Sequence, residues 1–181
     1  VYTIGPDKYV FIGREPNGGH QYAMTVDLTT SKIDTVRQIN ISPELQSWMP
    51  NMGEMAYSGK RNRLAFAYKL HPIIEVFGLD GSIIETVRVG GDTFDDSTLE
   101  MADFDSHNQL QFIDLCATPE FLYALHGAPS SSQTIYQIDW NGNIISRFVS
   151  DNNLKKIAIH NDTTIIGYSD SGFVTLRLSK P

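Results

Sequence analysis

The feature that most constrains the fold of this chain is a strand–turn–strand pattern that occurs three times. In the clearest copy, two segments rich in Ile, Val and Thr, 73–77 and 82–87, flank a turn that contains Asp80-Gly81. Glycine supplies the positive φ angle that a tight hairpin turn requires. Residues 135–148 repeat this pattern, and residues 25–37 repeat it again. The copies lie about 51 and 61 residues apart, a spacing typical of repeat arrays and propellers.

A second pair of expected strands precedes each hairpin. It comprises 53–58 and 63–69 in one unit, and 110–117 and 120–126 in the next. Four antiparallel strands per unit are the sequence pattern of a β-propeller blade. The two end units look incomplete: the last supplies the three strands 154–159, 163–168 and 173–178, and the first has only residues 1–4 ahead of its strand 9–13.

We therefore predict an all-β fold, with about four blades or partial blades in a single domain, 1–181. The repeat units are approximately 1–41, 51–89, 110–150 and 154–181. Because both end units look short of a full set of strands, we expect the chain to be part of a larger ring. The one helical turn that we expect spans 42–49, where a capping Ser42 precedes Pro43.

Charge excludes some classes of partner. The formal net charge is −7 and the pI is about 5.1, which opposes non-specific binding to nucleic acid or to an anionic membrane. No apolar run approaches the roughly 18 residues that a membrane-spanning helix needs. The single cysteine, Cys116, lies in an apolar run and is interpreted as a small buried hydrophobic residue rather than a reactive thiol.

The longest linker, 90–109, is rich in Asp and Glu and contains no Lys or Arg. A linker of this length in a compact domain indicates a functional or disordered loop. Residues 103–108 begin like a calcium-binding loop, but they lack the glycine and the closing glutamate of that motif. A solvated acidic loop is therefore the favoured interpretation.

The strand and turn patterns resemble those of the bacterial TolB-like six-bladed β-propeller proteins. The resemblance rests on residues 55–57, 63–68, 74–81, 121–125 and 138–143 and covers nearly the whole chain. Members of that family are typically about twice as long, so the resemblance implies that this chain corresponds to a C-terminal half. It also implies a periplasmic or cell-surface setting. The family contributes no catalytic motif and no binding residues to this sequence.

Candidate ligand-binding residues come from aligning the units. Arg14, Lys69 and His126 each follow the second strand of a unit, and His20 and His71 coincide under the 51-residue offset. Equivalent placement would give a partly cationic channel mouth suited to an anionic sugar or carboxylate. The favoured interpretation is instead that these are ordinary solvated strand ends. Trp48 is the better candidate for a surface aromatic, because Trp140 occupies a strand–turn corner of the repeat.

The usual catalytic signatures are absent from the sequence. We also expect no cofactor and no metal, because two histidines without a third ligand do not make a metal site. The first functional hypothesis is a non-catalytic propeller module that binds a protein or glycan partner and no nucleic acid. Its rival is a propeller-type hydrolase or lyase with its site at the channel mouth.

Overall fold

The computed structural model describes residues 1–16, 19–41, 48–90, 110–127 and 132–178, and these residues form β-strands and turns without a helix. The first sheet contains β1 (Tyr2–Gly5), β2 (Lys8–Arg14), β3 (Gln21–Asp27) and β4 (Lys32–Ile39). The second contains β5 (Gly53–Ser58), β6 (Arg63–Tyr68), β7 (Ile73–Gly78) and β8 (Ile83–Arg88). The third contains β9 (Phe112–Ala117), β10 (Phe121–His126), β11 (Gln133–Asp139) and β12 (Ile144–Ser150). The fourth contains β13 (Leu154–His160), β14 (Thr164–Ser169) and β15 (Gly172–Arg177).

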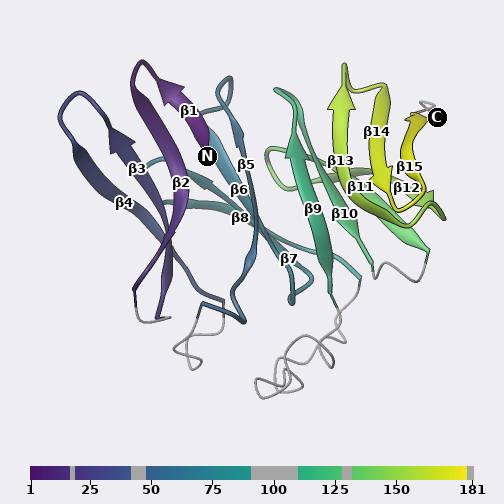
Figure 1. Ribbon diagram of the computed structural model, residues 1–181, viewed down its shortest axis with the longest axis horizontal. Helices are drawn as coiled ribbons and strands as arrows, with labels where there is room; N and C mark the ends of the chain where they lie inside the picture. Colours follow the sequence, from purple (N-terminus) through teal and green to yellow (C-terminus); the bar gives the residue numbers. More distant parts are fainter. Residues whose placement is uncertain (17–18, 42–47, 91–109, 128–131, 179–181) are drawn as a thin grey trace.

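Within each sheet every strand pairs antiparallel with the strand before it in the sequence. The four sheets follow one another across the molecule like the blades of a propeller (Figure 1). Their first strands lie toward the inside, where β9 packs between β5 and β13. The predicted all-β architecture of propeller blades is therefore confirmed.

The prediction that the first unit is incomplete was wrong. The short strand β1 pairs with β2 through Tyr2 and Val10 and through Thr3 and Tyr9, so the first sheet has all four strands. Four residues are enough for a strand when a neighbouring strand satisfies their backbone groups. The fourth sheet has three strands among the described residues, as the sequence predicted.

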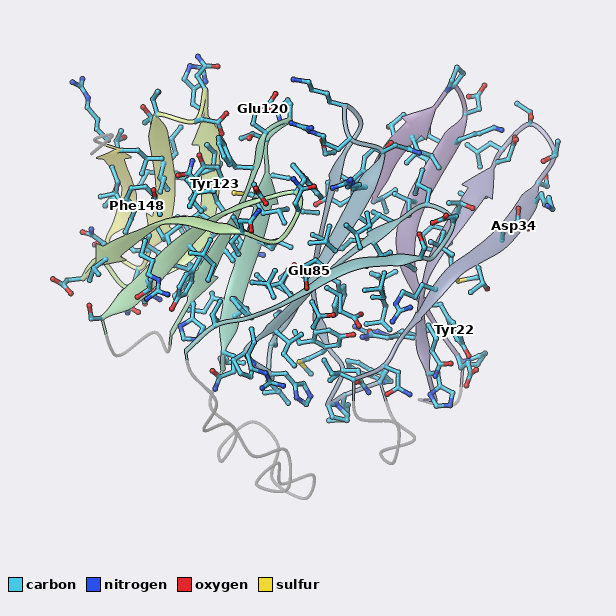
Figure 2. The ribbon with its side chains drawn as sticks, turned by 180° about the vertical axis from the view of Figure 1, so that it is seen from behind. Tyr22, Asp34, Glu85, Glu120, Tyr123 and Phe148 are labelled. Atoms are coloured by element: carbon cyan, nitrogen blue, oxygen red, sulfur yellow. The ribbon has the colours of Figure 1, made fainter. Side chains whose placement is uncertain are left out.

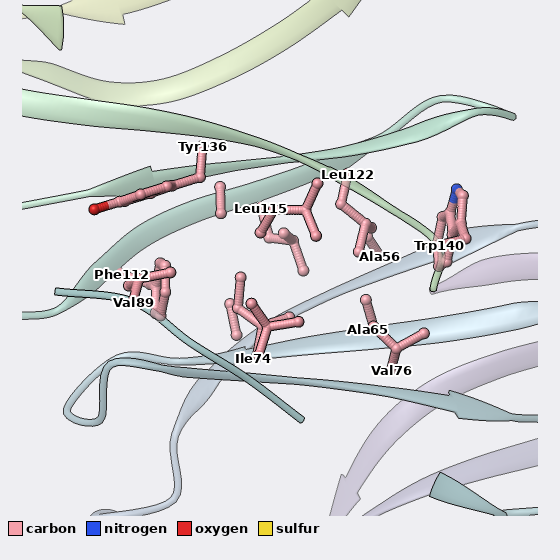
Figure 3. Close-up of a cluster of buried hydrophobic side chains, with 14 residues drawn as sticks. Ala56, Ala65, Ile74, Val76, Val89, Phe112, Leu115, Leu122, Tyr136 and Trp140 are labelled. Carbon is pink, nitrogen blue, oxygen red and sulfur yellow. The ribbon is translucent and has the colours of Figure 1, made fainter. Parts of the chain in front are cut away.

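The core lies between the sheets rather than within one of them. One cluster of buried side chains fills each space between consecutive sheets, and the cluster between the second and third sheets is the largest (Figure 3). Strand β7 contributes to two clusters, because Ile74 and Val76 face the third sheet while Ile73 and Phe77 face the first. Burial on both faces explains why β6 and β7 are apolar almost throughout.

The predicted hairpin turns are present. Gly81 and Gly142 adopt φ angles of 81° and 90°. In the first of these turns, Asp80 Oδ1 accepts a hydrogen bond of 3.0 Å from the backbone N–H of Ser82. A side chain at Gly81 would also meet the carbonyl oxygen of Val36 at 2.1 Å, so this glycine permits close packing between the first and second sheets.

Several predictions fall on residues that are not described. Most of the expected helical turn 42–49 lies outside the described residues, as do the acidic stretch 91–109 and the calcium-like pattern within it. Trp140 is buried at a strand–turn corner, as expected from the repeat. Among the described residues, none belongs to a helix long and apolar enough to cross a membrane.

Candidate functional site

The structure places the three aligned residues at one end of the molecule. Arg14 and His126 are the last residues of β2 and β10, and Lys69 directly follows β6. Second and fourth strands run in the same direction within each sheet, so the connections between blades begin at this same end. We call it the second-strand end (Figure 1).

At that end the three side chains have different partners. The guanidinium carbon of Arg14 lies 3.6 Å from the ring centroid of the half-buried Trp48. Lys69 Nζ lies 2.9 Å from Glu54 Oε1. The His126 ring packs edge-on against Phe112 and Tyr136, with centroid distances of 5.4 and 5.6 Å. Equivalent strand positions thus bring these residues to one end of the molecule, but each of the three side chains contacts a different set of residues.

The two aligned histidines occupy different environments. His71 is fully buried, its Nε2 lies 3.0 Å from the carbonyl oxygen of Pro50, and its ring stands edge-on to Tyr68. His20 is half-buried, and its backbone N–H donates to Glu15. Within the described ranges, no three His, Cys, Asp or Glu side chains are grouped to hold a metal ion. A ligand-binding role for His20, His71, Arg14, Lys69, His126 or Trp48 stays a prediction.

The sequence patterns did not indicate a charged cluster that the structure forms from Glu54, Asp114 and Lys156 on the inner strands β5, β9 and β13. We call it the inner-strand cluster, and Lys69, which follows β6, joins it through Glu54. Lys156 Nζ lies 2.8 Å from Asp114 Oδ1 and 3.5 Å from Glu54 Oε1. Asp114 is 6% exposed, and its Oδ2 accepts a 2.8 Å hydrogen bond from the backbone N–H of Ile157. The cluster therefore connects the second, third and fourth sheets near the centre of the molecule. The sequence feature that could have indicated this cluster is Asp114, the single charged residue in the apolar run 112–117.

Titratable groups in and beside this cluster have raised pKa values. Burial raises the pKa of the Cys116 thiol to about 12, and the charge of Asp114 adds to the shift. Burial, with the charges of Glu54 and Asp114, also raises the pKa of Tyr2. Burial alone would lower the pKa of Lys156, but its hydrogen bond to Asp114 and the nearby carboxylate charges outweigh that effect and raise it. A nucleophilic thiolate or amine requires the opposite shifts.

A pair of buried glutamines also links consecutive sheets. Gln133 Nε2 donates to the carbonyl oxygen of Leu154 at 2.9 Å, and its Oε1 accepts from the Leu154 backbone N–H at 2.6 Å. In the same way, Gln21 Nε2 donates to the carbonyl oxygen of Asn51. Both glutamines begin the third strand of a sheet. The two glutamines are 112 residues apart, which is the sum of the repeat offsets of about 51 and 61 residues. Aligning the repeat units could therefore have identified them as equivalent residues.

The outer strands of the third and fourth sheets enclose a groove of about 480 Å³. We call it the β12–β15 groove. Six of the nine lining residues are apolar, and two of these, Ile135 and Ile165, belong to the buried core: Ile135, Phe148, Val149, Ile165, Leu176 and Leu178. Thr175, Arg147 and Arg177 complete the lining. Figure 2 shows Phe148 beside the strands of the fourth sheet. Unlike the inner-strand cluster, this groove combines apolar side chains with two arginines and contains no carboxylate.

Comparisons with known proteins support the fold. No protein-family model matches the sequence, and no curated protein matches it. Among solved structures, BamB from Moraxella catarrhalis is similar over 91% of this chain and 41% of its own, with a TM-score of 0.53 and 11% identity. A protein of unknown function from Bacteroides caccae is similar over 97% of this chain and 59% of its own (TM-score 0.52, 10% identity). Hydrazine synthase from Kuenenia stuttgartiensis is similar over 86% and 40% (TM-score 0.52, 16% identity). The chain thus spans between two fifths and three fifths of these structures.

Proposed function

We propose that the chain is a non-catalytic propeller module that binds a partner protein through its fourth sheet. The observation that carries this proposal is an exposed apolar face on β14 and β15. Ile166, Tyr168 and Phe173 are 42%, 45% and 80% exposed, and the Tyr168 and Phe173 rings lie 5.4 Å apart. Contiguous exposed apolar side chains are typical of protein interaction sites. Aromatic residues are enriched in the centres of such interfaces.

Two features favour this function over the alternatives. The shifts of Cys116, Tyr2 and Lys156 hold these groups in their unreactive forms, which disfavours a hydrolase or lyase built on the inner-strand cluster. The Arg14 guanidinium already covers one face of Trp48, the aromatic residue best suited to stack on a sugar. A protein partner is therefore favoured over a glycan.

The finer predictions from the TolB-like resemblance belong to the same proposal. A periplasmic or cell-surface setting is the location that we propose, and cell fractionation with an antibody to the chain tests it. A six-bladed ring stays a prediction. It would place a further blade against the fourth sheet, which competes directly with a partner protein for the same apolar face.

Site-specific photocrosslinking tests the proposed function. A photoreactive phenylalanine analogue replaces Phe173 on the fourth sheet or, as a matched control, Ile33 on β4, which is 56% exposed. Irradiation of intact cells should yield a covalent adduct with another protein from position 173 and none from position 33. An absence of adducts from position 173, or the same adducts from both positions, would refute the proposal.

A further inference from the structure

The turn between β11 and β12 contains Asn141 and Gly142, the one Asn-Gly pair within the described ranges. Asn-Gly pairs deamidate spontaneously in water, because glycine has no side chain to hinder the reaction. The glycine backbone nitrogen loses its proton and forms a bond to the side-chain carbonyl carbon of the asparagine, whose side-chain nitrogen leaves as ammonia. Water then opens the resulting cyclic imide to aspartate or isoaspartate. Asn141 is exposed, so water reaches it.

The second sheet holds Gly142 in place. A side chain at this position would meet Glu85 Cγ at 2.2 Å and Val87 Cγ2 at 3.1 Å, so the backbone of Gly142 packs directly against β8. Both this close approach and the φ angle of 90° require glycine. The Gly142 N–H also donates a hydrogen bond of 3.0 Å to the carbonyl oxygen of Asp139. The nitrogen that would attack is therefore occupied while the turn lies against the second sheet.

The second sheet also holds the side chain of Asn141. Arg63, the first residue of β6, donates to Asn141 Oδ1 at 3.0 Å and to the carbonyl oxygen of Trp140. The backbone N–H of Asn141 donates to Asp139 Oδ1 at 2.8 Å, which fixes the turn on its other side. The carbon that the Gly142 nitrogen would attack is thus held through its own oxygen. Both reacting groups therefore depend on contacts with the second sheet.

We propose that Asn141 is a deamidation site controlled by the contact between the second and third sheets. While the two sheets are in contact, Arg63 and the hydrogen bond within the turn occupy both reacting groups. When the contact opens locally, both groups are released, and the reaction proceeds from that open state. Isoaspartate adds one carbon to the backbone of the turn, which moves Gly142 out of its close position against Glu85. The covalent change therefore marks chains in which the two sheets have separated.

Peptide mapping by mass spectrometry, after incubation of the whole chain at mildly alkaline pH, tests the inference. The folded chain should convert Asn141 at least about tenfold more slowly than the chain unfolded in urea, because only the open state reacts. Asn17, which also precedes a glycine, lies outside the described residues and is the internal reference in urea. There the two asparagines should react at similar rates. Equal rates for Asn141 with and without urea would overturn the proposal, as would an unreactive Asn141 in urea.

Matched variants separate this contact from general loosening of the fold. Arg63→Met removes the donor to Asn141 Oδ1, whereas Arg61→Met removes a nearby cation that pairs with Glu120 instead. Arg63→Met should deamidate about tenfold faster than the parent, and Arg61→Met within about twofold of it. Equal rates in the two variants would refute control by this contact.

A measurement on the unaltered chain does not depend on how the variants fold. Urea below the unfolding transition should speed deamidation of Asn141 and hydrogen exchange at the Gly142 N–H in parallel, because both proceed from the same open state. A rise in hydrogen exchange without faster deamidation would overturn the proposal.

Discussion

Apolar strand residues are buried in one region of the molecule and exposed in another. The first region is the space between the second and third sheets, which we call the seam, and the other is the outer face of the fourth sheet. In the seam, Val87 and Val89 are 5% and 2% exposed because the third sheet covers them. On the fourth sheet, Phe173 is 80% exposed because no described sheet lies against it. Apolar strand residues of this kind stabilise the fold only where a neighbouring sheet excludes water from them.

Polar contacts at the rim reinforce the seam. Arg63 donates to the carbonyl oxygen of Trp140 and, at 3.0 Å, to Asn141 Oδ1. Glu120, which is labelled in Figure 2, pairs with Lys60 and, at 2.6 Å, with Arg61. These hydrogen bonds from Lys60 and Arg61 lower the pKa of the Glu120 carboxyl. Exposed pairs add little stability individually, so we attribute the strength of the seam mainly to its apolar cluster.

The largest expected effect compares the same substitution in the two regions. Phe112→Ala removes a fully buried ring from the seam and should lower the free energy of unfolding by about 3–5 kcal/mol. Phe173→Ala removes an exposed ring and should change it by less than about 0.5 kcal/mol. Urea unfolding of the two variants measures the difference. Similar losses in both would show that Phe173 is covered in the native protein.

The second effect concerns the inner-strand cluster. Asp114→Ala removes the partner of Lys156 and of the Ile157 N–H, leaving a buried donor unpaired, and should cost about 1.5–3 kcal/mol. The matched control is Asp34→Ala, which breaks an exposed pair with Lys32 and should cost less than about 0.5 kcal/mol. Equal urea midpoints for both variants would contradict the role assigned to Asp114.

A smaller effect depends on pH. Burial lowers the pKa of His126 in the folded seam, so the unfolded chain binds this proton more readily. The contribution of neutral His126 should be complete above the unfolded pKa of about 6.5 and should decline as the pH falls toward the folded pKa. His126→Phe should flatten this decline in urea unfolding between about pH 7.5 and pH 5.5. An unchanged slope in that variant would assign the decline to other groups.

The smallest expected effect concerns Arg14, which lies outside both the seam and the fourth sheet. Arg14→Ala removes the cation from the face of Trp48 and should lower the free energy of unfolding by about 0.5–1 kcal/mol. The same variant tests the predicted anionic ligand, because calorimetry with acidic sugars should show weaker binding if Arg14 contacts one. Lys32→Ala is the control, since this exposed cation begins β4, at the end of the same sheet opposite to the second-strand end, and pairs with Asp34 at 2.9 Å.

The strands and turns were predictable because they depend on neighbouring residues. Alternation of Val, Ile and Thr with polar residues marks a strand, and Asp80-Gly81 marks a tight turn through local backbone geometry. The common end shared by Arg14, Lys69 and His126 was also predictable, since it follows from the repeat. The first sheet was the exception, because the completeness of a four-residue strand such as β1 depends on its pairing with β2.

Side-chain partners were not predictable, since they join residues far apart in the sequence. His20 and His71 are equivalent by alignment, but packing against Tyr68 buries His71 completely and leaves His20 half-exposed. Similarly, Lys69 is a strand end in the sequence, and its pairing with Glu54 depends on how β5 and β6 are aligned.

The amino-acid sequence by itself determined that this protein is a series of antiparallel β-sheets, because hairpin formation depends on short-range periodicity and turn chemistry. The tertiary structure decided which charges meet and which apolar faces stay open. Glu54, Asp114 and Lys156 form one cluster because the inner strands of three sheets converge, and Phe173 is exposed because no described sheet covers the face of the fourth sheet on which it lies. Whether strands converge and whether a face is exposed depend on how the sheets are arranged in space. A local sequence pattern does not specify that arrangement.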